Sequence, residues 1–189
     1  MVYSVRMRFR PNTAPLKSLY LCGSFLVFCA FAVSAFAGNR ADSPTQGTEK
    51  ADSILLLKKE HVMELLTGGK VMRTYKVALG SGGLAPKQRE GDTRTPEGHY
   101  IIDAKFEHSS YYKALHVSYP NPEDRESAAK LGVAPGGAIM IHGLPNGKGW
   151  VGARHRLYDW TLGCIAVTDE EMDEVWKLVP VRTPVEIRP

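Results

Sequence analysis

The chain has 189 residues, of which 43% are apolar and 23% charged. This length is enough to bury one ordinary hydrophobic core but short for two large domains, so we expect a single globular domain. Positions 1–37 hold four of the 24 Lys and Arg residues and none of the 20 Asp and Glu residues, which accounts for the whole formal net charge of +4. The remainder is balanced, which argues against nucleic acid as a partner.

The first 37 residues have the pattern of a signal peptide. Basic residues precede a nearly unbroken apolar run from Leu19 to Ala37, and the run closes with Ala35-Phe36-Ala37, a cleavage pattern of small residues. We therefore expect an exported protein of the periplasm or cell envelope. The run is also nearly long enough to span a bilayer, and as an uncleaved anchor it would bring the protein to the membrane. The small, polar residues 38–51 are expected to form a linker.

The folded domain is expected at 52–189, and short apolar or alternating runs predict strands through most of it. The first three runs should form an antiparallel meander. A segment at 80–98 carries five Gly and two Pro residues and must be loop and turn. The expected strands lie at 53–59, 61–66, 70–79, 99–106, 113–119, 137–143, 164–168 and 185–189.

Two short helices interrupt these strands. One is expected at 122–132, with Pro at its start and Gly at its end. The other follows Thr168, which forms a capping box with Glu171 and precedes apolar residues at helical spacing. Because strands dominate, we predict a mainly β fold, built as a curved mixed sheet or a β-sandwich with one or two short helices.

Cys164 is the only cysteine outside the N-terminal segment, so it has no intramolecular disulfide partner. A free thiol is a liability in an oxidising compartment, which favours a reactive role over that of a small buried apolar residue. A cysteine nucleophile needs a base and donors for the oxyanion. We expect His142, at the end of the buried run "IMIH", to be the base. Gly143 allows close backbone approach, and Gly163 leaves room for a substrate carbonyl beside backbone N–H donors.

The segment between the two catalytic candidates carries further polar residues. His155, in "ARHRLYDW", is the rival base, although its loop position favours a substrate contact or a surface residue. Arg154 and Arg156 flank it and suit carboxylates as bidentate partners. Thr161 is expected to donate to the thiol or to pin its turn.

A metal site is the competing interpretation of the same residues. His142, His155 and Cys164 would be the zinc ligands, but their spacing is that of no common zinc motif, so we expect no metal and no cofactor. The remaining histidines lie in strand or turn contexts and are expected to be structural. They are His61, His99, His108 and His116.

Two segments resemble the L,D-transpeptidase catalytic domain, also called the YkuD domain. "IHG" at 141–143, followed by a loop and "TLGCIAV" at 161–167, is similar to the family's active-site motif, in which a histidine precedes a Ser/Thr-x-Gly-Cys element. "GDTRTPEGHYII" at 91–102 is similar to a Gly-Asp-x-x-Thr-Pro-x-Gly-x-Tyr segment of that family. The resemblance runs from about Ser53 to the C-terminus.

The resemblance implies an enzyme of peptidoglycan biosynthesis, cell wall organisation and cell shape. Cys164 would form an acyl-enzyme with a stem peptide, His142 would act as base, and the acyl group would pass to an amine. Hydrolysis by the same acyl-enzyme, as a carboxypeptidase or an amidase that detaches a wall-linked protein, is an alternative, as is a non-catalytic cell-wall-binding module. Leu162 and Ala166 stand where the family often has a second histidine and an Arg or Asn. Backbone groups would therefore stabilise the oxyanion.

Overall fold

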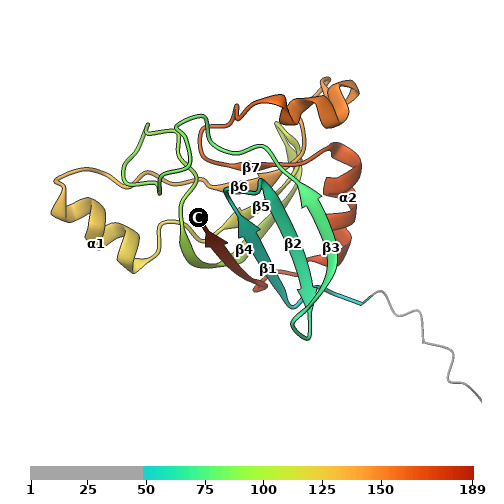
Figure 1. The fold of residues 1–189 in the computed structure, drawn as a ribbon, viewed down its shortest axis with the longest axis horizontal. Helices are drawn as coiled ribbons and strands as arrows, with labels where there is room; N and C mark the ends of the chain where they lie inside the picture. Colours follow the sequence, from blue (N-terminus) through green and yellow to red (C-terminus); the bar gives the residue numbers. More distant parts are fainter. Residues whose placement is uncertain (1–48) are drawn as a thin grey trace, which may run out of the picture. The chain divides into compact units, whose positions relative to one another are not determined.

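The computed structural model describes residues 49–189, and the expected signal or anchor at 1–37 lies outside this part. The described residues form a mixed sheet of eight strands with two α-helices and a 3-10 helix (Figure 1). The strands are β1 (Ser53–Leu57), β2 (Val62–Thr67), β3 (Lys70–Lys76), β4 (Gly98–Ser109), β5 (Tyr112–Val117), β6 (Met140–His142), β7 (Ile165–Ala166) and β8 (Pro184–Arg188). The helices are α1 (Pro122–Lys130), η1 (Gly149–Leu157) and α2 (Asp169–Leu178).

The strand order is β3-β2-β1-β8-β4-β5-β6-β7. The first three strands form the expected antiparallel meander. The last strand in the chain, β8, lies inside the sheet, parallel to β1 and antiparallel to β4. Because β6 and β7 are also parallel, the sheet is mixed, as the sequence predicts.

The sheet curves back on itself. Strand β4 pairs with β8 near its start and with β5 along the rest of its length, and its pairing register with β5 shifts twice. Such irregularities bend a strand and increase its twist. Beyond β3, Ala78 forms an antiparallel bridge to Ala166 of β7, so the two ends of the strand order meet. The predicted curved, mainly β fold is confirmed.

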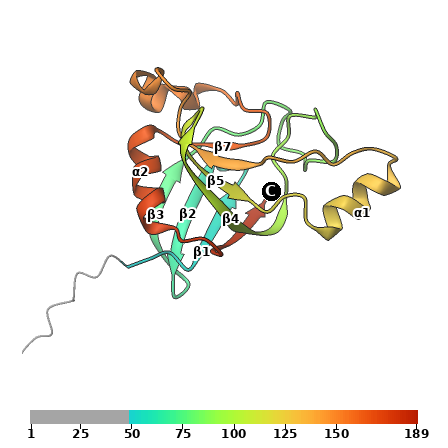
Figure 2. The same cartoon turned by 180° about the vertical axis from the view of Figure 1, so that it is seen from behind.

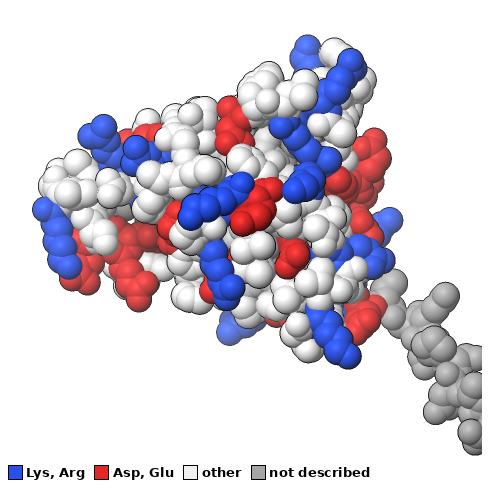
Figure 3. Space-filling model, in the orientation of Figure 1, with Lys and Arg blue, Asp and Glu red and all other residues white. Residues whose placement is uncertain are grey.

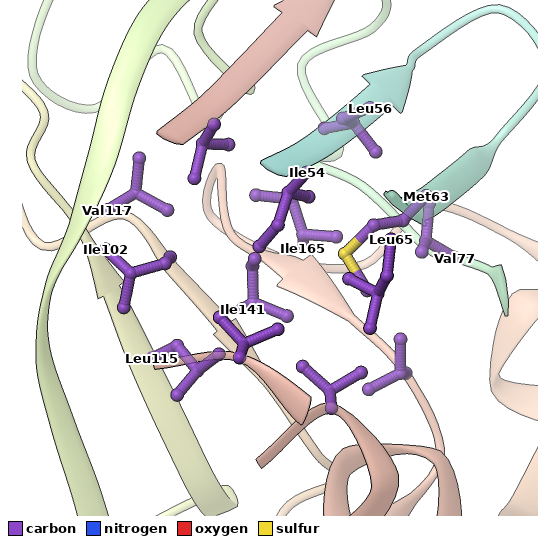
Figure 4. Close-up of a cluster of buried hydrophobic side chains, with 14 of the residues drawn as sticks. Ile54, Leu56, Met63, Leu65, Val77, Ile102, Leu115, Val117, Ile141 and Ile165 are labelled. Atoms are coloured by element: carbon purple, nitrogen blue, oxygen red, sulfur yellow. The ribbon is translucent and has the colours of Figure 1, made fainter. Parts of the chain in front are cut away.

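The concave side of the sheet holds the hydrophobic core. Alternate residues of the strands point into it, as shown for Ile54, Met63, Ile102, Ile141 and Ile165 (Figure 4). Each of these five side chains is at most 1% exposed. Burial of apolar surface on this scale is the main stabilising contribution to a domain of this size.

The two α-helices lie at opposite ends of the domain (Figure 2). The predicted capping box of α2 is present: the amide of Glu171 donates to Thr168 Oγ1, and the amide of Thr168 donates to the Glu171 carboxylate. Met172 and Val175 on the inner face of this helix are fully buried. Among the residues described, none of the helices combines the length and the apolar character that crossing a membrane requires.

Strands β6 and β7 are less than half as long as the sequence indicates. The run at 137–143 is extended only over Met140–His142, because Ala138 has a positive φ of 56° that breaks the strand. The run at 164–168 pairs only over Ile165–Ala166.

Acidic and basic side chains are interspersed over the face drawn in Figure 3, consistent with the balanced charge beyond position 37.

Candidate active site

Cys164 and His142 come from neighbouring strands. In the parallel pair β6 and β7, His142 lies opposite Ala166, so Cys164, just before β7, lies beside Met140. Residues two apart along a strand share a face, which makes Cys164 and His142 diagonal neighbours, with Cα atoms roughly 7–8 Å apart by the usual geometry of adjacent strands. The structure therefore brings the expected nucleophile and base together on one face of the sheet.

The surroundings of His142 select one tautomer of its ring. Its Nδ1 lies 2.6 Å from the carbonyl oxygen of Gly143, which can only accept, so Nδ1 carries the proton and Nε2 carries the lone pair. The side chain is buried, and burial lowers the pKa of His142 against the opposing effect of this hydrogen bond. A neutral imidazole with a free Nε2 is the form that a general base requires.

The thiol of Cys164 is held in its neutral form. Burial raises its pKa, and the backbone N–H of Met140 and the positive charge of Lys87 only partly oppose this effect. The Sγ atom donates a hydrogen bond to the carbonyl of Ala138 at 3.5 Å. Since only the thiolate is a strong nucleophile, a base must remove this proton during the reaction.

The turn that carries the thiol is stabilised by Thr161. Its Oγ1 donates to the carbonyl of Cys164 at 2.7 Å and accepts from the amide of Gly163 at 3.1 Å. Thr161 thus pins the turn and does not donate to the thiol. The amide of Gly163, one of the expected oxyanion donors, is already used within the turn.

Gly163 is required by the close approach of another loop. Its φ is +124°, and a Cβ atom there would lie 2.6 Å from the carbonyl oxygen of Arg94. A Cβ on Gly80 would lie 2.9 Å from the Cα of Gly163, and Gly80 forms a parallel bridge to Thr161. The segment "GDTRTPEG" therefore packs backbone to backbone under the nucleophile turn.

A family model described as the L,D-transpeptidase catalytic domain, YkuD, matches residues 51–187. The chain belongs to the L,D-transpeptidase catalytic domain family. The candidate L,D-transpeptidase YafK of Escherichia coli (strain K12) is 32% identical over 132 residues, which cover 67% of this chain and 46% of YafK. The chain thus spans about half the length of the curated relatives it matches.

Solved structures share the fold of this chain. A variant of the helical cell shape determining protein Pgp2 from Campylobacter jejuni is 27% identical, with a TM-score of 0.57 over 74% of this chain and 47% of Pgp2. The L,D-transpeptidase of Xylanimonas cellulosilytica shares the fold at 17% identity, with a TM-score of 0.51 over 77% of this chain and 64% of that chain.

The L,D-transpeptidase domain holds His155 inside the structure. The ring lies in η1 and is 5% exposed, so it is not the surface histidine that its loop position indicated. Trp160 Nε1 donates to its Nδ1 at 3.4 Å, and no described group pairs with its Nε2. The Trp160 ring lies between the two histidines, with centroids 5.9 Å from His142 and 6.4 Å from His155. His155 therefore packs against Trp160, and both residues line a small pocket with Leu144.

The two predicted arginines of this segment have different environments. Arg156 forms an ion pair with Glu171 of the capping box, so its guanidinium already has a carboxylate partner. Arg154 is exposed, and its guanidinium carbon lies 6.0 Å from the centroid of the Trp150 ring. Of the two, Arg154 is the one available to a substrate.

Gly143 is needed for packing. A Cβ atom there would lie 2.6 Å from Asp169 Oδ1, which accepts a hydrogen bond from the amide of Leu144. Its carbonyl accepts the hydrogen bond of His142 Nδ1, so Gly143 acts on the expected base through the backbone.

Within residues 49–189, no three His, Cys, Asp or Glu side chains are grouped so that they could hold a metal ion.

Two further residues lie beside the expected catalytic pair. Tyr111, in the turn between β4 and β5, lies over the base, with ring centroids 4.6 Å apart. Lys87 is buried near the thiol and pairs with Asp92 at 2.8 Å. Asp92 belongs to the family-like segment at 91–102, so the motif pointed to this carboxylate. The contacts of Tyr111 and Lys87 depend instead on the pairing of distant segments, which no local motif reveals.

A fully buried lysine anchors the "GDTRTPEG" loop. Lys58 follows β1, and its Nζ donates to Thr95 O at 2.9 Å, Ala85 O at 3.3 Å and Glu97 Oε1 at 2.8 Å. Thr95 Oγ1 in turn accepts from the amide of Gly80, which packs on Gly163. Lys58 thus supports the nucleophile turn from the opposite side of the loop.

We expect Lys58→Met to lower the free energy of unfolding by roughly 3–5 kcal/mol, because it leaves the carboxylate of Glu97 and two carbonyls without their cation. Urea unfolding followed by circular dichroism measures the change. Lys59→Met, on the exposed neighbour, is the matched control and should change stability by less than about 0.5 kcal/mol. Equal effects of the two substitutions would contradict the anchoring role.

The burial of His155 predicts a pH dependence of stability. Burial, followed by the charge of Arg156, lowers its pKa from 6.5 to about 4. The fold therefore favours the neutral ring, and this contribution to stability is complete above pH 6.5 and is lost as the pH falls toward 4, by roughly 3 kcal/mol. Urea unfolding between pH 7 and 4 should show this loss, with a shallower decline in His155→Gln. Parallel declines would mean that His155 is not responsible.

Proposed function

We propose that this domain is an exported acyltransferase that uses Cys164 to form a thioester with a peptidoglycan stem peptide and transfers the acyl group to an amine. The placement of Cys164 and His142 on adjacent strands, with His142 Nε2 free to accept a proton, is the observation that carries this proposal. Membership of the L,D-transpeptidase family supports the substrate class.

The proposed reaction has two halves. His142 Nε2 takes the proton of the Cys164 thiol as Sγ attacks the substrate carbonyl carbon. The backbone amide of Cys164 is our candidate donor to the oxyanion, because that of Gly163 is already bonded to Thr161. Collapse breaks the C–N bond, and His142 returns the proton to the leaving amine. An acceptor amine then attacks the thioester and gives its proton to His142. The C–S bond breaks, and His142 returns this proton to the departing thiolate of Cys164.

Water in place of the acceptor amine would make the same domain a carboxypeptidase or an amidase that detaches a wall-linked protein. Both outcomes begin with the same thioester. Mass spectrometry of muropeptides after incubation with the mature protein distinguishes them: a new cross-linked product supports transfer, and only trimmed or detached products support hydrolysis. A protein that binds peptidoglycan without changing it would instead be a cell-wall-binding module.

Export and cell shape belong to this proposal as well. The apolar run that ends at Ala37 and the family's link to the cell wall favour the periplasm or cell envelope. The likeness to Pgp2, named as a helical cell shape determining protein, makes cell shape the phenotype to score in a deletion strain.

N-terminal sequencing of the exported protein would show a new terminus near Gly38 if the segment is a cleaved signal, and Met1 if it is an anchor.

A further inference from the structure

A cavity of about 510 Å³ is lined in part by the loop of Arg94, which packs against the turn that carries Cys164. Two contacts join the cavity's surroundings to that turn. The carbonyl of the lining residue Arg94 lies against Gly163, and the amide of Ser81, which precedes the lining residue Gly82, donates to Thr161 O at 2.9 Å. A ligand in this cavity would therefore lie next to the turn that holds Cys164. The lining residues are Gly82, Gln88, Arg89, Asp92, Arg94, Leu131 and Val133.

The only carboxylate of the lining, Asp92, is occupied by other groups. Its Oδ1 accepts from Lys87 Nζ at 2.8 Å and from the amide of Arg94 at 3.1 Å, and its Oδ2 accepts from the amides of Gln88 and Arg89 at 2.7 and 3.0 Å. Burial works to raise the pKa of Asp92, but these hydrogen bonds together lower it to about 2. Asp92 is thus ionised, and it shapes the loop while Lys87 balances its charge.

The two arginine side chains of the cavity lack an anionic partner. Arg94 Nε donates to the carbonyl of Gly82 at 3.2 Å, which fixes the guanidinium and leaves both terminal nitrogens without a hydrogen bond to any residue in 49–189. Arg89 forms no ion pair and no side-chain hydrogen bond within the same range. A Cβ on Gly82 would lie 2.8 Å from Arg94 Cγ, so glycine at this position lets the arginine lie across the backbone.

The cavity also has an apolar part. Leu131 is 58% exposed, and Val133 lines the cavity with it. Guanidinium groups bind carboxylates through paired, charge-assisted hydrogen bonds, while apolar side chains favour the aliphatic stem that carries the carboxylate. The complementary ligand is a carboxylate on a short aliphatic chain.

We propose that Arg89 and Arg94 form a carboxylate-binding site that holds the peptide substrate beside Cys164. This proposal rests on the proposed function, because it assigns a binding site to the same peptide substrate. The backbone of Arg94 supports Gly163 while its side chain binds the substrate, so one residue sets the position of the nucleophile turn relative to the bound peptide. Arg154, on η1, is not part of this site.

Peptide binding to the full chain carrying Cys164→Ala tests the site without turnover. The probes are a synthetic stem tetrapeptide with free carboxylates and the same peptide with every carboxylate amidated, measured by isothermal titration calorimetry. We expect the free-carboxylate peptide to bind at least about tenfold more tightly. Adding Arg89→Gln and Arg94→Gln together should remove this difference, whereas adding Arg182→Gln, on an exposed arginine outside the cavity, should preserve it.

Equal affinity of the two peptides for the protein with both arginines intact would overturn the proposal, and this comparison does not depend on whether the double variant folds. Unchanged discrimination in a folded double variant would also overturn it. The muropeptide assay on the unmutated enzyme is independent. Peptide binding that depends on the two arginines, without any muropeptide product, would support the binding site but contradict the proposed acyltransferase activity. Product formation together with binding that does not depend on the arginines would contradict the binding site alone.

Discussion

Cys164→Ala is expected to abolish thioester formation and all turnover while the domain stays folded. No other group at the site replaces the sulfur in the first covalent step, and Cys164 is the only cysteine beyond position 37. Its one side-chain hydrogen bond, to Ala138 O at 3.5 Å, is long and weak, so its loss should change the free energy of unfolding by no more than about 1 kcal/mol.

Intact-protein mass spectrometry after incubation with a stem peptide measures this effect, because a thioester adds the mass of the acyl group. A carbapenem, which the family resemblance implies should acylate the thiol, is a second probe. Thermal unfolding of the variant serves as the control for folding. A covalent adduct on a folded Cys164→Ala protein would place the nucleophile elsewhere.

His142→Ala is expected to lower kcat/KM by about 10²–10⁴-fold, as for loss of a positioned general base. The effect should be large because burial raises the pKa of the Cys164 thiol, so little thiolate is present near neutral pH without a base. Replacement of His155 should cost much less, since its Nδ1 accepts from Trp160 and its pKa is near 4. Near-normal activity of the His142 variant, with loss in His155→Gln, would move the base to His155.

The same assignment predicts the pH profile. Because burial lowers the pKa of His142, the ring stays neutral to a lower pH than a solvent-exposed histidine does. Activity should therefore persist below pH 6.5 and disappear only as the pH falls through the lowered pKa of His142. An acidic limb of kcat/KM centred above pH 6.5 would contradict this assignment.

Several features of the domain follow from local sequence patterns. Alternating apolar residues place Ile54 and Leu56 in the core, and Thr168 with Glu171 starts α2 where the capping pattern indicates. The family motifs predict the mainly β fold. These inferences succeed because each depends on residues that are close in the chain, where backbone geometry alone decides which side chains share a face.

Strand order and ion pairing are different, because they depend on segments far apart in the chain. A closing strand is expected at 185–189, and only the pairing of β8 with β1 and β4 places it inside the sheet. Lys58 had the pattern of the polar end of a strand, but the folded chain buries it against a loop that begins more than twenty residues later.

The sequence by itself determined the family and the strand content, since short motifs and period-two patterns encode them. Tertiary structure alone decided which charges are free. Arg156 was expected to bind substrate, yet α2 brings Glu171 to it, whereas Arg94 stays unpaired because four nearby donors occupy Asp92. An arginine can bind a ligand only if no protein carboxylate reaches it first, and that depends on how distant segments pack.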